Sequence, residues 1–138
     1  MELYKNILLT IDCSPVDDVI VEHIINLAKI HGSQVNILHV VHSHTLDQNK
    51  YLKEKANEFI EKHIKYFDKE KIKTKIIIRS GEPEKEIIEE IETGNYHLIA
   101  MATHGHKYFM DFLYGSVSDT LKHKTNIPIL LIKGNFHP

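Results

Sequence analysis

The chain has 138 residues, the length of one ordinary domain, and its 17 basic and 19 acidic residues give a formal net charge of −2. These charges are spread along the chain, so the sequence offers no basic surface of the kind that binds nucleic acid or an anionic membrane. The N-terminal apolar run ends at Asp12, too early for a signal peptide or a membrane span, and a single cysteine excludes an intrachain disulfide. We therefore expect one domain over residues 1–138, located in the cytoplasm, with a small or neutral partner.

Five apolar segments with the character of buried strands alternate with four helical patterns along the chain. The first helix is predicted to begin after Ser14 as its N-cap, with Pro15 at its first position, and to end at Gly32. The strands are predicted at residues 5–11, 34–41, 75–80, 97–102 and 127–133.

The other three helices are placed by their apolar faces and their end signals. The third is predicted to open at Pro83 and to end at Gly94, and the fourth to open at Ser116, three residues before Asp119 in a capping-box-like arrangement. The second is long and charged, and its inward stripe is predicted to consist of Leu52, Ala56, Phe59, Ile60, His63 and Phe67.

This alternation predicts an α/β fold of the Rossmann-like kind, an open five-stranded parallel sheet with helices on both faces. The reason is that crossovers between parallel strands are almost always right-handed. Ligands of such sheets bind outside the carboxyl ends of the strands, where the strand order reverses. The segments in which to seek a site are therefore 10–14, 40–44, 80–82 and 101–116.

Two familiar phosphate-binding signatures are missing: no Gly-Lys-Ser/Thr ends a Walker loop, and no GxGxxG follows the first strand. After the fourth strand, however, ATHGHKYFMDFLYGS carries Gly105 and, after nine intervening residues, Gly115 followed by Ser116. Glycine lets backbone amides approach an anion, and the N-terminus of a helix favours negative charge. The segment is suited to hold a polyphosphate; its other interpretation is a glycine turn followed by an ordinary capped helix.

The sequence resembles the universal stress protein family nearly from end to end. KNILLTIDCSP resembles the first strand of that family and its aspartate, NILHVV the second strand, RSGEP the third strand and turn, and NIPILLIK the closing strand. The nucleotide-binding members carry Gly-x2-Gly-x9-Gly-Ser/Thr after the fourth strand, and residues 102–116 follow this motif except at Ala102. The resemblance implies an adenine nucleotide alpha hydrolase-like fold that binds ATP, ADP or AMP with Mg²⁺ as a homodimer, without a well-defined enzymatic turnover.

Matched position by position, the resemblance implies that Asp12 lies beside the nucleoside, that the backbone of Val40 meets the adenine edge, and that the motif after the fourth strand holds the phosphates. The alanine at position 102 costs little at a negative φ, but its methyl group would obstruct a ligand pressed against the backbone. The nucleotide-binding residues that the resemblance implies are Thr10, Ile11, Asp12, Val40, Met101, Ala102, Gly105, Gly115, Ser116, Val117 and Ser118.

Two H-x-H pairs occur at the expected ligand-binding edge, His42 with His44 and His104 with His106. Neither pair is accompanied by a cysteine or carboxylate at a spacing that completes a metal site, so no metal ligand is predicted. His106 and Lys107 are better candidates for neutralising phosphate charge.

Three functions remain open at this point: an adenine-nucleotide-binding stress or signalling module, a nucleotide-free dimeric module that binds proteins, and a slow ATP hydrolase. No catalytic residue is assigned. The homodimer is expected to form through the fifth strand, because its apolar residues would otherwise leave an exposed, aggregation-prone sheet edge. Cys13 is expected to be a small, partly buried filler rather than a redox sensor.

Overall fold

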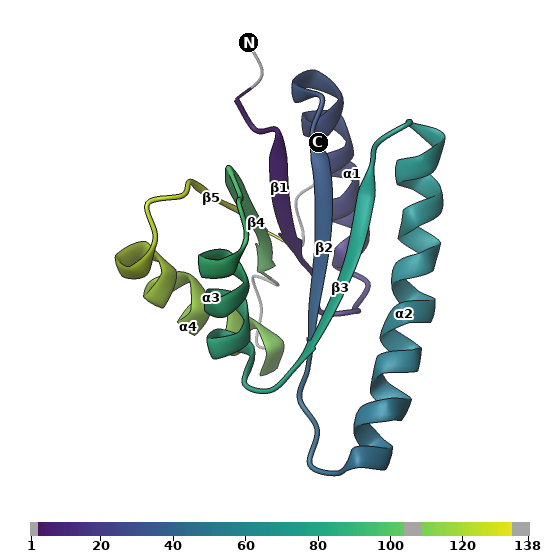
Figure 1. The fold of residues 1–138 in the computed structure, drawn as a ribbon, viewed down its shortest axis with the longest axis vertical. Coiled ribbons are helices and arrows are strands. Elements are labelled where there is room, and N and C mark those ends of the chain that lie inside the picture. The colour runs from purple at the N-terminus through teal and green to yellow at the C-terminus, as the bar shows by residue number, and fades with distance from the viewer. Residues whose placement is uncertain (1–2, 104–108, 134–138) are drawn as a thin grey trace.

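The computed structural model describes residues 3–103 and 109–133, and at positions 103 and 109–116 it describes the backbone alone. It confirms the predicted architecture, since five parallel strands form one sheet in the order β3-β2-β1-β4-β5 (Figure 1). The strands are β1 (Asn6–Thr10), β2 (Gln34–Val41), β3 (Thr74–Ser80), β4 (Leu98–Thr103) and β5 (Ile129–Lys133). The helices are α1 (Asp17–His31), α2 (Leu46–Lys69), α3 (Pro83–Thr93) and α4 (Phe109–Lys124).

Helices α1 and α2 cover one face of the sheet, and α3 and α4 cover the other (Figure 1). The central position of β1 explains why the middle of the strand is apolar at consecutive residues, because alternate side chains enter different layers. Ile7 and Leu9 belong to the apolar cluster beneath α1 and α2, whereas Leu8 belongs to the cluster beneath α3 and α4. The strand order reverses between β1 and β4, so the carboxyl ends of these strands form the switch point.

The start of α1 differs from the sequence prediction. The helix begins at Asp17 without a side-chain cap, so the prediction of Ser14 as the N-cap and Pro15 as the first helical residue is wrong. The physical reason is that the Asp17 carboxyl accepts hydrogen bonds from backbone N–H groups before the helix, from Ser14 at 3.1 Å and from Asp12 at 3.4 Å. These bonds shape residues 12–16 as a loop, which leads into α1 through the hydrogen bond from the Asp17 N–H to the Ser14 carbonyl oxygen at 3.0 Å.

The start of α4 also differs. The helix begins at Phe109, so Gly115 and Ser116 lie inside it, and the prediction that Ser116 opens the helix is wrong. Only the first four N–H groups of a helix lack an intrahelical partner. The N–H groups of Gly115 and Ser116 are therefore committed to the helix in this structure, because both residues lie beyond the first turn.

The remaining boundaries agree with the sequence to within about two residues. Gly32 ends α1 in the left-handed conformation, with φ of 61°, as its role as a stop signal requires. The inward stripe of α2 is confirmed at its buried members, Ala56, Ile60, His63 and Phe67, while Leu52 and Phe59 are half-buried. None of the helices within residues 3–103 and 109–133 has the length and apolarity to span a bilayer.

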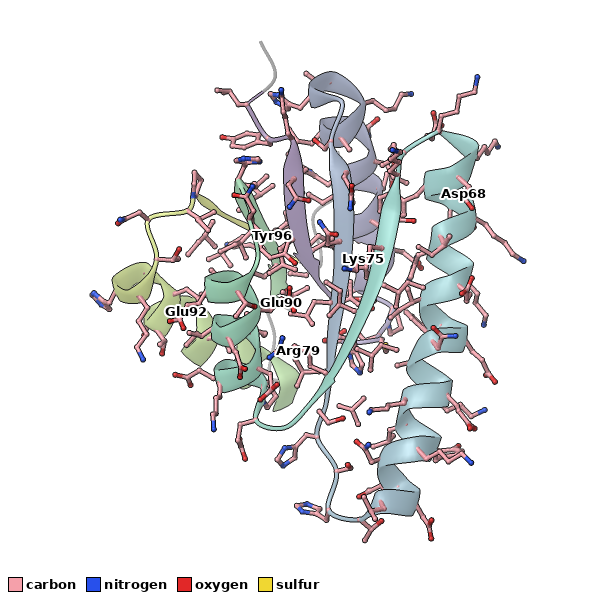
Figure 2. All side chains as sticks on the ribbon, in the orientation of Figure 1. Asp68, Lys75, Arg79, Glu90, Glu92 and Tyr96 are labelled. Atoms are coloured by element: carbon pink, nitrogen blue, oxygen red, sulfur yellow. The ribbon has the colours of Figure 1, made fainter. Side chains whose placement is uncertain are left out.

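Charged side chains fasten α3 to the sheet. Arg79 of β3 lies 3.0 Å from Glu86, 2.9 Å from Glu90 and 3.3 Å from Glu89, all on α3. The hydroxyl of Tyr96, which follows α3, donates to Glu90 at 2.6 Å. Figure 2 shows Arg79, Glu90 and Tyr96 on the side of the sheet that α3 covers. This network holds the helix that carries the chain across the strand reversal from β3 to β4.

Candidate functional site

A cavity of about 460 Å³ lies at the carboxyl ends of β1 and β2, beside α2; we call it the β1–β2 cavity. It brings together Asp12 and Val40, which the sequence assigned to the nucleoside end of a nucleotide. Ligand sites of open parallel sheets occur at this edge, and a cavity of this volume suits a small molecule. Its further lining includes Cys13, His39 and His42 from the sheet side, and Leu52, Lys55, Phe59 and Lys62 from α2.

The loop between β1 and α1 is shaped as a concave group of backbone N–H donors. Cys13 has a positive φ of 62°, a conformation that turns neighbouring N–H groups toward one point. The N–H of Ser14 lies 3.1 Å from Asp17 Oδ2 and 3.1 Å from Asp12 Oδ1, so two carboxyl groups share one donor. The Asp17 side-chain carboxyl group therefore fills a concavity that would otherwise suit an external anion.

Burial governs the charges of this loop. Only 1% of Asp17 is exposed, and burial, followed by the charge of Asp12, raises the pKa of Asp17 to about 8 although backbone N–H groups oppose the shift. Burial, followed by the charges of Asp17 and Asp12, raises the pKa of the Cys13 thiol to about 12. Cys13 is half-buried as predicted, and its thiol stays protonated at neutral pH, which disfavours redox reactivity.

His39 is a cavity residue that the sequence prediction missed. Its ring atom Nδ1 lies 3.0 Å from the carbonyl oxygen of Ile11, and burial lowers its pKa. The available signal was an ionisable residue within the apolar run ILHVV, near the carboxyl end of the strand. Which layer that side chain faces became clear only from the position of α2.

Three of the predicted nucleotide-binding residues, Thr10, Ile11 and Met101, are buried in the sheet and its adjoining loop. The Thr10 hydroxyl donates to the carbonyl oxygen of Ala100 at 3.3 Å, which ties β1 to β4 at the switch point. These residues fix the strand ends and have little side-chain surface to offer a ligand.

The residues predicted to hold phosphate lie at the end of β4 and in α4. Ala102 is not among the described residues with positive φ, and its methyl group belongs to the apolar cluster beneath α1 and α2. Val117 and Ser118 are buried on α4, and Gly115 and Ser116 lie in the same helix. Gly105 lies outside the described residues, as do His104, His106 and Lys107.

The histidine pair after β2 lies at the rim of the cavity. The rings of His42 and His44 meet edge to face with centroids 5.4 Å apart. His42 Nδ1 lies 3.3 Å from the carbonyl oxygen of Gly81 and 3.9 Å from Glu82 Oε1. Across the part of the chain that the structure describes, no group of three histidine, cysteine, aspartate or glutamate side chains is arranged to hold a metal ion.

Comparison with known proteins identifies the family. The model of the universal stress protein family matches residues 3–133. Universal stress protein MJ0577 of Methanocaldococcus jannaschii is 26% identical over 155 residues, which cover 95% of this chain and 96% of that protein. Its solved structure superposes with a TM-score of 0.78, covering 95% of this chain and 96% of that one.

Two more distant structures share the fold. A universal stress protein of Archaeoglobus fulgidus in complex with dAMP is 18% identical, with a TM-score of 0.70 and coverage of 95% of this chain and 99% of that one. Another, in complex with cAMP, is 12% identical, with a TM-score of 0.74 and coverage of 96% and 99%. Because the family model spans almost the whole sequence, this chain belongs to the universal stress protein family.

Proposed function

We propose that this chain is an adenine-nucleotide-binding module of stress response or signalling in the cytoplasm, with ATP and Mg²⁺ as its ligand. The observation that supports it most is the β1–β2 cavity, where Asp12 and Val40 meet at the carboxyl ends of adjacent strands. The cavity has the size of a small-ligand site, and two relatives of the same fold were solved in complex with dAMP and cAMP. In this proposal the nucleoside occupies the cavity and the phosphates extend toward α4.

The phosphate end of the proposed site requires a change in α4. Gly115 and Ser116 offer free N–H groups only at the start of a helix, and they now lie inside one. We therefore expect ATP to shorten α4, so that the helix begins near Ser116. Hydrogen exchange would detect this as faster exchange at residues 109–114 in the presence of ATP.

Titration calorimetry with ATP and Mg²⁺ tests the nucleotide site directly. Gly115→Val is expected to weaken ATP binding about a hundredfold or more, because a branched side chain would stand where the phosphates approach the backbone. His123→Val places the same residue on an exposed position of the same helix and should bind like the wild type. Equal affinities in all three proteins would sink the assignment of Gly115.

The second candidate is a nucleotide-free dimeric module that binds other proteins. It is favoured by Ala102 at the first glycine of the motif and by the helical state of Gly115 and Ser116. Chromatography of the small molecules released from freshly purified, denatured protein separates the two candidates. Co-purified adenine nucleotide supports the first, and protein that neither releases nucleotide nor binds ATP in calorimetry supports the second.

We further propose a homodimer that pairs through β5. The strand forms one edge of the sheet, and Leu131 on it is 44% exposed, whereas Leu130 packs toward the interior. Light scattering should give about twice the chain mass of 16.0 kDa, and Leu131→Lys should give the mass of a single chain. Monodisperse wild-type monomer at micromolar concentration would refute the dimer.

A further inference from the structure

His39 lies in β2 directly before Val40 and lines the β1–β2 cavity with Asp12. The side chain is half-buried, and Nδ1 lies 3.0 Å from the carbonyl oxygen of Ile11. A carbonyl oxygen only accepts hydrogen bonds, so the hydrogen of this bond is on Nδ1. The contact with the β1–α1 loop therefore selects one tautomer of the ring.

The charge of the ring follows from its surroundings. Burial lowers the pKa of His39, and this effect exceeds the opposing effects of the Ile11 carbonyl and the charge of Asp12. A neutral ring with its hydrogen on Nδ1 has a lone pair on Nε2, which makes Nε2 an acceptor. Within the described residues no donor contacts this atom, and it is not sealed from solvent as His63 Nε2 is.

We propose that His39 is a specificity-determining residue of the β1–β2 cavity, whose Nε2 accepts a hydrogen bond from an uncharged N–H or O–H group of the bound nucleotide. The inference rests on the proposed nucleotide-binding function. Two groups of an adenine nucleotide have this chemistry, the exocyclic amino group and the ribose hydroxyls. A phosphate oxygen is an acceptor, so it has no hydrogen to donate to Nε2 of His39. His39 therefore orients the nucleoside inward and the phosphates toward α4.

A comparison of nucleotides in wild type and His39→Asn tests the proposal. The asparagine amide places a donor near the position of Nδ1, so the bond to the Ile11 carbonyl is retained, but it has no atom at Nε2. Calorimetry is done with ATP, inosine triphosphate, 2′-deoxy-ATP and 3′-deoxy-ATP, each with Mg²⁺. Wild type should bind ATP about tenfold more tightly than the analogue that lacks the recognised donor, and His39→Asn should lose this preference.

His42→Asn is the matched control, since it changes another imidazole of the same cavity. His42→Asn should change the affinities of all four nucleotides by the same factor, so that ATP still binds more tightly than the analogue that lacks the recognised donor. Wild type that binds ATP with the same preferences as His39→Asn would overturn the role of His39 and leave the nucleotide-binding function standing. Wild type that binds none of the four nucleotides would overturn both.

Nitrogen NMR of the wild-type imidazole provides a second readout that does not depend on a stable variant. The Nε2 resonance of His39 should lie in the range of an unprotonated ring nitrogen and should move when ATP is added. A resonance that is typical of a protonated nitrogen, or one that stays unchanged at saturating ATP, contradicts the proposal.

Discussion

Two cavities of nearly equal volume adjoin α2: the β1–β2 cavity, of about 460 Å³, and one of about 470 Å³ between α1 and α2, here the α1–α2 cavity. Each cavity contains one histidine that is shielded from solvent, His39 in the first and His63 in the second, and burial lowers the pKa of both. In the first, His39 is held by a backbone carbonyl and keeps Nε2 accessible. In the second, His63 Nε2 is sealed without a partner, and Nδ1 lies 3.9 Å from the exposed Asp18.

The contrast shows that volume alone does not identify a binding site. The carboxyl ends of parallel strands lie side by side at one edge of the sheet, and the sheet fixes their positions. Polar groups placed there therefore keep a defined direction. The α1–α2 cavity is lined by side chains of two helices, among them Glu22, Tyr66 and Lys69, which extend from separate backbones. The preorganised acceptor of His39 is therefore our reason for proposing the β1–β2 cavity, rather than the α1–α2 cavity, as the ligand site.

Filling each cavity in turn should produce the largest difference. Leu52→Trp places a large ring in the β1–β2 cavity and is expected to abolish measurable ATP binding by steric exclusion. Ile25→Trp makes the equivalent change in the α1–α2 cavity and should leave ATP affinity within about twofold of wild type. Calorimetry measures both. Loss of binding in Ile25→Trp with retention in Leu52→Trp would reverse the assignment of the two cavities.

A second test concerns the stability cost of the β1–α1 loop. The folded protein raises the pKa of Asp17 from 3.8 to about 8, so it holds this proton more tightly than the unfolded chain. The contribution of Asp17 to stability is therefore greatest at low pH and falls as the pH rises from about 4 to about 8. Asp17→Asn removes the charge but also one of the two acceptor oxygens. Relative to wild type, its free energy of unfolding in urea should therefore be higher at pH 9 than at pH 4, by on the order of a few kcal/mol.

The control for that measurement is Asp68→Asn on the exposed end of α2, which should change stability little at either pH (Figure 2). Equal effects of Asp17→Asn at both pH values would show that the charge of Asp17 does not limit stability.

The smallest effect is expected in the α1–α2 cavity. His63→Leu removes a buried ring nitrogen without a partner and should raise the free energy of unfolding by about 1 kcal/mol at neutral pH. Burial lowers the pKa of His63, with Asp18 opposing and Lys62 adding to the shift, so wild type loses stability as the pH falls through about 6.5. The difference in the free energy of unfolding between His63→Leu and wild type should therefore grow toward pH 5. The substitution should leave the affinity for ATP unchanged. The exposed His123→Leu is the control, and a weaker ATP affinity in His63→Leu would link the two cavities.

The sequence predicts the sheet well because its strands are local apolar runs and its helices have local stop signals such as Gly32. Helix starts were harder to predict. At Ser14 the local capping signal was outcompeted by the Asp17 carboxyl, which binds amides of the preceding loop. At Ser116 the signal lies within a helix that already begins at Phe109. Such competition depends on contacts that a local pattern does not contain.

The sequence predicts only part of the candidate site, and the residue that it misses also depends on contacts outside the local pattern. Asp12 and Val40 were assigned from the resemblance to the family, and the structure brings both to one cavity. His39 was missed because its significance depends on α2, which closes the cavity from the side with Leu52 and Phe59. A strand pattern shows that a polar residue interrupts an apolar run, but not which helix lies over it.

The central position of β1 has a consequence for synthesis of the protein. Ile7 lies opposite Val35 of β2 on one side and opposite Leu98 of β4 on the other. A nascent chain can pair β1 with β2 early, but the other edge of β1 has no partner until β4 has left the ribosome. During that interval an apolar strand edge is open to other nascent chains. A chaperone that recognises extended apolar segments would therefore find a target at β1, whose residues 7–10 the finished fold buries between its neighbours.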